Sequence, residues 1–273
     1  MPRKEWVVCF VRSDKEKSKI IYMSEPEVIF ENADFVVIDK PAGLVVHGAR
    51  VSERRRADAA HAGKARGAEP TLVDWLVKRY PKIKTVGDDP ALRPGIVHRL
   101  DKATSGVMIV AKTQASFEEL KKLFQEHRMR KTYYALVHGV PKNLRGTIDA
   151  PIGIKNGSLK RSIHSSKMAK SAVTEYSVVK VIGKNDKDGV AQYALLKVNP
   201  LTGRTHQIRV HLASIGHPIV GDALYGKKTD AAAAPRLMLH AAALIFSDDA
   251  GNRFEFEVPL PPRFYLSTGH SFP

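Results

Sequence analysis

Short apolar runs, separated by turn residues and a few amphipathic stretches, constrain the fold of this chain more than any other feature. The all-apolar run Val107–Ala111 predicts a buried strand, because it is too short for a helix. Further runs rich in β-branched and aromatic residues predict strands over 28–30, 35–38, 131–138, 172–181, 193–198, 237–246 and 254–258. Strands mixed with scattered helices indicate the α+β class, with a central mixed, largely antiparallel sheet.

Three stretches predict helices. Thr71-Leu72-Val73-Asp74 matches a capping box, so a helix should begin there and end near Tyr80. Ser116–Glu119 predicts a second helix start, which is followed by apolar residues at helical spacing. Residues 203–215 predict a third helix, and Gly216 should end it because glycine readily adopts a left-handed backbone.

Composition limits the classes of function. The chain has 273 residues, with 44 Lys and Arg against 28 Asp and Glu and a formal net charge of +16. This balance favours a polyanionic partner such as nucleic acid, although charge does not separate RNA from DNA or from an anionic membrane surface. A single cysteine, Cys9, excludes an internal disulfide and favours a reducing compartment. Since no apolar run approaches the roughly 18 residues of a membrane span, we expect a cytoplasmic protein without membrane association.

The segment His98–Gly106 sets one carboxylate, Asp101, beside an arginine and a histidine in a tight turn. An Asp in such a turn commonly only caps a helix or tightens a loop. A second dense polar cluster, Gly203–Leu212, favours a chemical role. An Asp nucleophile must be ionised and held in place, and a nearby Arg favours the charged carboxylate. The chain has no P-loop, no dinucleotide-binding turn and no cysteine-based metal motif, so we expect no cofactor.

These two segments, together with Asp39–His47, Lys131–Val137 and Gly216–Asp222, resemble the RluA-type RNA pseudouridine synthases. The resemblance runs from about Glu27 to about Pro262, with the motifs in the family's order. It implies the pseudouridine synthase fold, in which an active-site cleft splits the central sheet. It also implies an enzyme, an isomerase that converts specific uridines of ribosomal or transfer RNA to pseudouridine without a cofactor, after flipping the base.

The resemblance assigns the catalytic residues. Asp101 matches the nucleophile, which attacks the uridine before uracil rotates and rejoins the sugar through C5. Arg209 matches the Arg that lies against this Asp, although a surface ion pair is the simpler alternative. Tyr133 matches the tyrosine that stacks on uracil and assists proton transfer. Tyr134 is assigned to packing, since neighbouring residues of a strand face opposite ways.

Several residues are expected to contact RNA. Arg99 can fill the space that the flipped base leaves, or it can bind only a phosphate. Basic stretches over 121–131 and 155–170 either contact phosphates or form solvated surfaces. The full set of predicted RNA-binding residues is Arg99, His98, Arg204, His206, Gln207 and Lys131.

The expected domain organisation follows from the same match. Residues 1–26 should be an N-terminal extension without a separate RNA-binding domain, and residues 27–273 the catalytic domain. The segment 49–69, which contains Arg54-Arg55-Arg56, departs from the family as a basic mobile insertion that either contacts RNA or is an inert loop. We expect a monomer.

Two other functions stay open at this stage. The same scaffold could bind RNA without catalysis. A metal-dependent phosphodiesterase could use the histidine-rich set, but two of its members lie five residues apart on the predicted helix, off a common face, so we expect no metal. That set is His98, Asp101, His206 and His211.

Overall fold

The computed structural model describes residues 8–9, 21–22, 25–48, 69–155, 160–183, 193–226, 234, 236–262 and 264. The chain divides into two compact units: residues 1–102 with 108–122, and residues 103–107 with 123–273. Most of the predicted N-terminal extension and residues 49–68 of the predicted basic insertion lie outside the described residues. The domain boundaries given above stay predictions.

The first unit carries a hairpin and two short helices. Strands β3 (Glu27–Glu31) and β4 (Phe35–Lys40) pair antiparallel, and β4 is almost entirely buried. They are followed by α2 (Leu72–Arg79) and the 3-10 helix η1 (Pro81–Thr85). A short pair, β1 (Val8–Cys9) with β2 (Ile21–Tyr22), precedes them.

The predicted capping box of α2 is confirmed. Thr71 Oγ1 accepts a hydrogen bond from the Asp74 amide at 3.3 Å, and the Asp74 carboxylate accepts one from the Thr71 amide at 2.8 Å. Each bond satisfies an amide that would otherwise lack an acceptor at the helix start. The helix ends at Arg79 with Tyr80 as its C-cap, which agrees with the predicted end near Tyr80.

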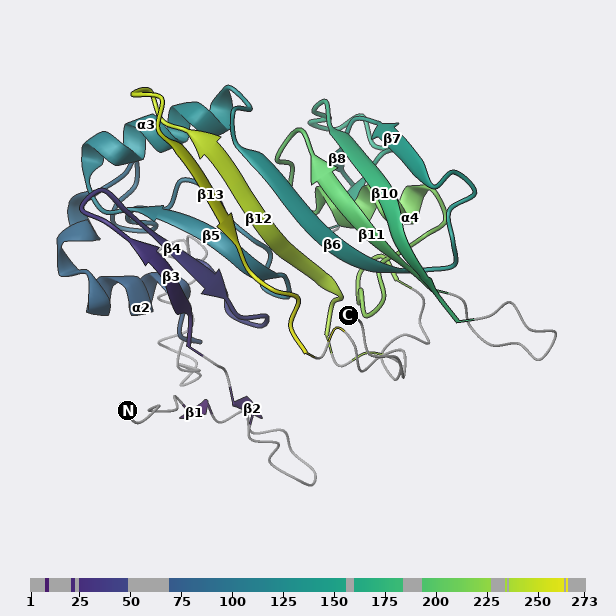
Figure 1. Cartoon of the computed structure of the whole chain (residues 1–273), viewed down its shortest axis with the longest axis horizontal. Helices are drawn as coiled ribbons and strands as arrows, with labels where there is room; N and C mark the ends of the chain where they lie inside the picture. Colours follow the sequence, from purple (N-terminus) through teal and green to yellow (C-terminus); the bar gives the residue numbers. More distant parts are fainter. Residues whose placement is uncertain are drawn as a thin grey trace, which may run out of the picture. The chain divides into compact units, whose positions relative to one another are not determined.

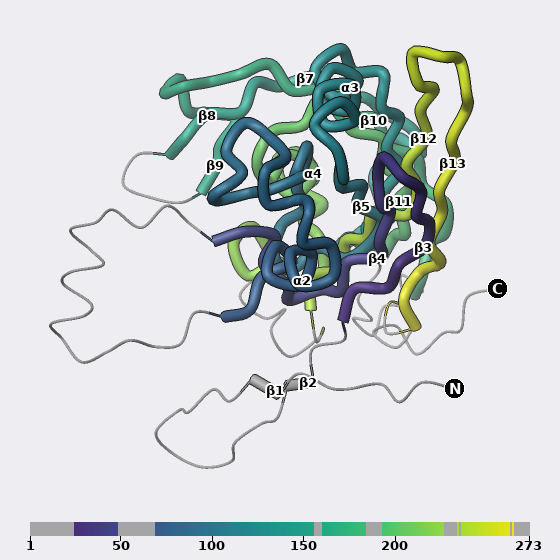
Figure 2. The backbone as a smooth tube through the Cα atoms, turned by 90° about the vertical axis from the view of Figure 1, so that its left-hand side faces the viewer, coloured from purple at the N-terminus to yellow at the C-terminus, as the bar shows by residue number. Residues whose placement is uncertain are grey.

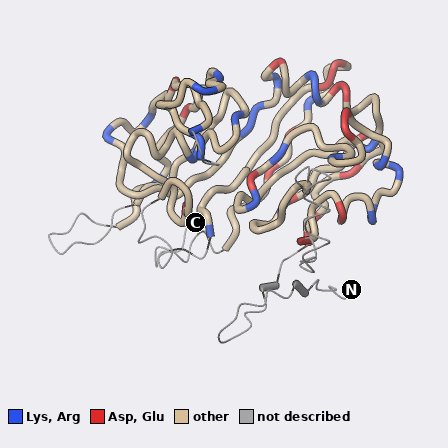
Figure 3. Tube along the Cα trace, turned by 180° about the vertical axis from the view of Figure 1, so that it is seen from behind, with Lys and Arg blue, Asp and Glu red and all other residues tan. Residues whose placement is uncertain are grey.

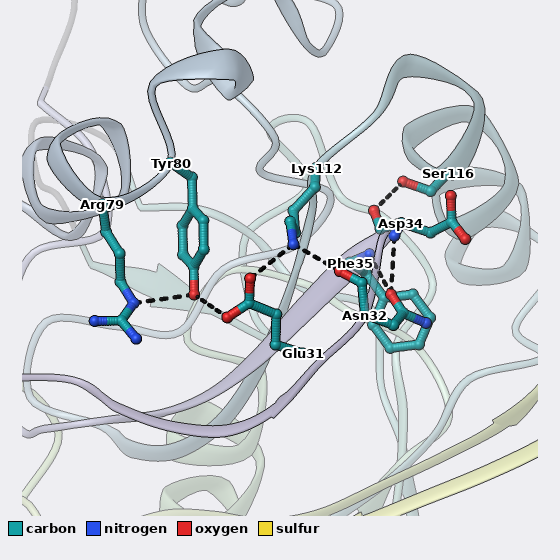
Figure 4. Close-up of polar contacts among 8 residues, drawn as sticks. All are labelled: Glu31, Asn32, Asp34, Phe35, Arg79, Tyr80, Lys112 and Ser116. Atoms are coloured by element: carbon teal, nitrogen blue, oxygen red, sulfur yellow. Dashed lines mark hydrogen bonds and ion pairs between the residues drawn. The ribbon is translucent and has the colours of Figure 1, made fainter.

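A polar network at the surface joins β3, α2 and the segment after β5 (Figure 4). The Lys112 amine and the Tyr80 hydroxyl donate to the two carboxylate oxygens of Glu31 at 2.7 and 2.8 Å. Arg79 Nε donates to the Tyr80 oxygen at 3.1 Å. The pKa of Glu31 is below its usual value because the bonds from Lys112 and then Tyr80 favour the carboxylate.

The second unit is built on a twisted sheet (Figure 1). The neighbouring strands β12, β6, β11, β10 and β7 pair antiparallel in that order. Strand β13 turns back along β12 in a hairpin, which is plain in Figure 2. Their bounds are β6 Arg130–His138, β7 Arg145–Asp149, β10 Val173–Ile182, β11 Tyr193–Pro200, β12 Leu239–Ser247 and β13 Arg253–Glu257.

Strand β5 (Ser105–Ala111) makes the sheet mixed, since its first residues pair parallel with β12. Gly106, at φ +119°, is required there, because a Cβ at this position would lie only 2.6 Å from the Ala241 amide nitrogen. All seven residues of β5 are buried, which confirms the predicted buried strand. The prediction of a mixed, largely antiparallel α+β fold is confirmed.

Two predicted helix starts are wrong. Helix α3 (Gln114–Gln125) begins before Ser116, because Thr113 Oγ1 accepts the Ser116 amide at 3.2 Å and caps the helix three residues earlier. Helix α4 (Gln207–Ser214) begins after Gly203, because His206 holds a left-handed backbone at φ 58°. Its end is as predicted, with Gly216 at φ +84°.

Helix α4 packs against β10 and β11. Its apolar residues Ile208 and Leu212 join a cluster of buried side chains from β6, β11 and β12. A small hairpin, β8 (Gly153–Ile154) with β9 (Arg161–Ser162), lies in the same unit. No helix in the described part of the chain has the length and apolarity needed to cross a membrane.

Candidate active site

The turn that carries Asp101 is fixed by its neighbours in the first unit. The Lys102 carbonyl accepts hydrogen bonds from the Gly43 amide at 2.7 Å and from the Lys40 amine at 3.3 Å. Lys40 is fully buried, and its amine also donates to the carbonyls of Pro41 and Leu44 at 2.8 and 2.9 Å. Asp101 itself is half-buried, so its carboxylate belongs to a rigid turn that is still reached by solvent.

The two basic residues before Asp101 have different surroundings. Arg99 is exposed, and its guanidinium lies 3.2 Å from the ring of His47, which leaves it open to a polyanion. His98 Nε2 accepts the Ile109 amide at 3.1 Å, so this imidazole holds the turn against β5. The geometry therefore supports contact of Arg99 with RNA at the surface. His98 instead fixes the turn to β5.

Arg209, in the second unit, forms a buried ion pair. Its Nε and Nη2 donate to the two carboxylate oxygens of Asp222, both at 2.8 Å. Arg209 is only 7% exposed and Asp222 only 2%, so the surface ion pair considered above is excluded for this contact. The predicted pairing of Arg209 with Asp101 joins residues of different units and stays a prediction.

Asp222 is held in its charged form. Burial alone would raise the pKa of this carboxyl group, but the bonds and charge of Arg209 outweigh it and lower the pKa below its usual value. The amides of Leu224 and Tyr225 also donate to Asp222 Oδ1, at 2.9 and 3.1 Å. The carboxylate therefore fixes both the guanidinium and the turn that follows it.

Tyr133 lies on the face of the sheet that α4 covers. Thr174 faces α4, since its hydroxyl bonds to both Gln207 and His211 at 3.0 and 2.9 Å. Tyr176 shares that face and pairs through Val198 with Tyr133. Tyr133 therefore points to the side of the sheet that holds the helix of Arg209.

Tyr134 points to the opposite face. That face carries a groove of about 1040 Å³, and Tyr134, Lys197 and Asn199 line it while Tyr133 does not. The geometry supports the choice of Tyr133 over Tyr134 for the active site.

Gln207 is buried, and its amide is fully used inside the protein. Its oxygen accepts from Thr202 Oγ1 at 2.7 Å and from the Arg204 amide at 2.9 Å. Its nitrogen donates to the Val173 carbonyl and to the Thr174 hydroxyl, both at 3.0 Å. These four bonds use all the donors and acceptors of the amide side chain, so Gln207 supports the loop before α4, and its contact with RNA stays a prediction.

Lys131 and Arg204, two of the predicted RNA-binding residues, form hydrogen bonds within the protein. The Lys131 amine donates to the Thr202 carbonyl at 3.4 Å, and burial lowers the pKa of this lysine to about 8. Arg204 Nε donates to the Ser171 carbonyl at 2.9 Å. Both side chains therefore support the loop before α4. Their contact with RNA stays a prediction.

Two histidines of the second unit, His206 and His211, form hydrogen bonds within the protein. Both nitrogens of His211 are engaged, by the Thr174 hydroxyl at 2.9 Å and the Ala150 carbonyl at 3.0 Å. His206 Nδ1 lies 2.9 Å from the Tyr225 hydroxyl. Among the described residues, no group of three or more His, Cys, Asp or Glu could hold a metal ion.

Sequence reasoning assigned no role to several residues that shape this region. Lys40, Asp222 and Tyr225 are three of them, and His240 and the half-buried Arg236, which lie beside Ser105, are two more. Ser105 Oγ lies 2.8 Å from His240 Nδ1 and accepts a bond from Arg236 Nη2 at 2.6 Å. The sequence feature that could have identified such residues is a polar residue next to an apolar stretch, as with Asp222 after Pro218–Val220.

Comparison with known proteins identifies the family. Residues 34–214 match the model of the RNA pseudouridylate synthase family. An uncharacterized RNA pseudouridine synthase of Chloroflexus aurantiacus is 42% identical over 225 residues, 82% of this chain and 62% of that protein. The chain thus spans less than two thirds of that relative.

Two further relatives are covered more fully. The dual-specificity RNA pseudouridine synthase RluA of Escherichia coli K12 is 33% identical over 233 residues, 85% of this chain and 92% of that protein. The structure of human RNA pseudouridylate synthase domain containing 1 superimposes with a TM-score of 0.67 at 27% identity, over 89% of this chain and 87% of that one. The predicted fold is therefore confirmed, and the chain belongs to the RNA pseudouridylate synthase family, as a member of the RluA type.

Proposed function

We propose that this protein is an isomerase that converts specific uridines of structured ribosomal or transfer RNA to pseudouridine. Family membership supports the reaction. The observation that carries the assignment of Asp101 is its turn, which the buried Lys40 amine and the Gly43 amide hold through the Lys102 carbonyl. A carboxylate on a rigid, half-exposed turn suits a nucleophile that must meet a flipped nucleotide at a defined place.

The proposed reaction balances without a cofactor. The Asp101 carboxylate attacks the flipped uridine, and the bond between the sugar C1′ and uracil N1 breaks. Uracil rotates, a bond forms between C1′ and C5, and the proton that C5 loses is taken up at N1. The aspartate is regenerated, so no oxidant, reductant or energy source is consumed.

The other residues have supporting roles in this proposal. Arg209 pairs with the nucleophile and keeps it ionised, while Asp222 fixes the guanidinium. Tyr133 stacks on uracil and moves the proton late in the reaction. Arg99 fills the space of the flipped base, and unstacking that base costs about a few kcal/mol. We also propose that the protein acts as a monomer in the cytoplasm.

The test is transcriptome-wide pseudouridine mapping in cells that lack the gene, rescued with wild type or with Asp101→Asn. We expect at least one site to disappear and to return only with the wild type. The mapped site also identifies the RNA. Retained modification with Asp101→Asn would refute the nucleophile, and RNA binding without any lost site would favour a catalytically silent RNA-binding protein.

A further inference from the structure

Tyr225 touches three parts of the second unit at once. Its hydroxyl oxygen accepts the backbone amide of Arg161, in β9, at 2.8 Å. The same oxygen lies 2.9 Å from Nδ1 of His206, the residue that precedes α4. The guanidinium carbon of Arg209 lies 5.2 Å from the centre of its ring.

The ring of Tyr225 is anchored as well. It packs with Ile163 against the buried cluster of Ile152, Ala172 and Val210, at the base of the β8–β9 hairpin. Its own amide donates to Asp222, the partner of Arg209, at 3.1 Å. A tyrosine held from both sides in this way can transmit a displacement of the hairpin to the guanidinium.

The β8–β9 hairpin is the basic part of this arrangement. Lys155, Lys160 and Arg161 lie in or beside its two strands, and Figure 3 draws the Lys and Arg of the described trace in blue and the Asp and Glu in red. Lys155 and Lys167 are exposed. The Lys155 amide donates to the Lys160 carbonyl in the hairpin, and the Lys167 carbonyl, beyond the end of β9, accepts the Ile154 amide of β8. Exposed lysines beside this strand pair fit the phosphate groups of RNA.

We propose that Tyr225 is a positioning residue that couples phosphate binding by the β8–β9 hairpin to the placement of Arg209. The inference rests on the proposed function for its substrate. The hydroxyl fixes the hairpin to the start of α4 through Arg161 and His206. The Tyr225 ring holds the Arg209 guanidinium in place through a cation–π attraction. RNA held by the hairpin therefore stabilises the orientation of Arg209 that the reaction needs.

Two variants separate the hydroxyl from the ring. Tyr225→Phe keeps the ring under Arg209 but loses both hydroxyl bonds. KM for an unmodified transcript carrying the target uridine should therefore rise about three- to tenfold, and kcat should fall because the bound hairpin no longer fixes Arg209. Tyr225→Leu also removes the ring, so kcat should fall further. Tyr193→Phe is the matched control, since Tyr193 is a half-buried tyrosine of the same unit whose ring contacts His138.

The coupling itself is tested with a double-mutant cycle. Lys155→Ala with Lys167→Ala should raise KM in the wild-type background and raise it less in the Tyr225→Phe background. Equal increases in the two backgrounds, or a Tyr225→Phe variant that behaves like Tyr193→Phe, would overturn the proposal. Thermal unfolding of each variant shows whether it is folded.

Hydrogen exchange gives a readout that does not need turnover. Binding of the transcript should slow amide exchange at the start of α4 in the wild type, and Tyr225→Phe should abolish this protection while speeding exchange in the hairpin. Protection that survives in Tyr225→Phe rejects the coupling. A wild type that forms no pseudouridine instead rejects the proposed function, and the exchange result still decides the coupling.

Discussion

Asp222 and Arg209 form a bidentate ion pair, in which Nε and Nη2 of the guanidinium each donate a 2.8 Å hydrogen bond to the carboxylate. This geometry fixes both the position and the plane of the guanidinium, which a single bond would not do. Asp222 therefore binds the same arginine that we propose to pair with Asp101.

Asp222→Asn should abolish most turnover and destabilise the protein. The change leaves the buried Arg209 charge without its partner, which costs on the order of 3–5 kcal/mol for pairs of this kind. The free energy of unfolding in urea and kcat measure the two effects. Glu118→Gln is the control, because Glu118 forms an exposed 3.6 Å ion pair with Lys121 and should change stability by at most about 1 kcal/mol. Equal effects of the two changes would contradict the structural role of Asp222.

Lys40→Met should lower kcat more than it raises KM. The substitution keeps a similar volume but removes the amine from three carbonyl groups, including that of Lys102 next to Asp101. A carbonyl buried without a donor costs about 1–3 kcal/mol, and the turn that carries the proposed nucleophile should loosen. Lys112→Met removes a lysine from the Glu31 network at the surface and should leave kcat near wild type. A Lys40→Met enzyme with normal kcat would show that the turn holds without the amine.

His240 should make the protein less stable as the pH falls from about 6.5 to about 4. Burial and then the charge of Arg236 lower the pKa of this histidine to about 4 in the folded protein. The unfolded chain, which titrates near 6.5, therefore binds more protons across this window, and stability is lost as the pH decreases. The loss amounts to roughly 3 kcal/mol.

Urea unfolding at a series of pH values checks the His240 prediction. His240→Asn removes the titrating group, so its unfolding free energy should change much less between pH 6.5 and 4. The lowered pKa of Asp222 acts in a lower window, since its stabilisation is present above the unfolded pKa near 3.9 and is lost as the pH falls below it. Identical pH profiles for wild type and His240→Asn would rule out the histidine as the source.

Tyr133→Phe should slow turnover strongly, whereas Tyr134→Phe should not. The two residues are neighbours on β6, but Tyr133 faces the α4 side of the sheet and Tyr134 lines the groove on the other side. Loss of a group that moves a proton costs about a hundredfold or more in rate. Single-turnover rates at saturating RNA compare the two variants directly. If Tyr134→Phe is slower than Tyr133→Phe, Tyr134 and not Tyr133 is the active-site tyrosine.

Local signals were enough to predict several elements. The bonds between Thr71 and Asp74 lie within one helical turn, so the start of α2 is readable from four residues. The buried strand Val107–Ala111 needs only its own composition. The family motifs likewise pointed to Asp101, Tyr133 and Arg209 without any knowledge of the fold.

Partners that are distant along the chain could not be predicted in this way. The helix of Arg209 was expected to begin at Gly203, but His206 takes a left-handed backbone, and its ring bonds to Tyr225, nineteen residues later. Gln207 was predicted to contact RNA, but it is buried, and its amide nitrogen donates to the Thr174 hydroxyl of β10. Helix propensity and motif spacing carry no information about such tertiary contacts, which decide where the side chains point.

Gly106 has a consequence for how the chain finds its register. Only a hydrogen atom fits between β5 and the backbone of Ala241, so a shift by one residue would press the side chain of Ser105 or Val107 into that space. The glycine therefore selects one alignment of β5 on β12. In a mutagenesis library, substitutions at this codon should reduce the amount of folded protein and not merely its activity.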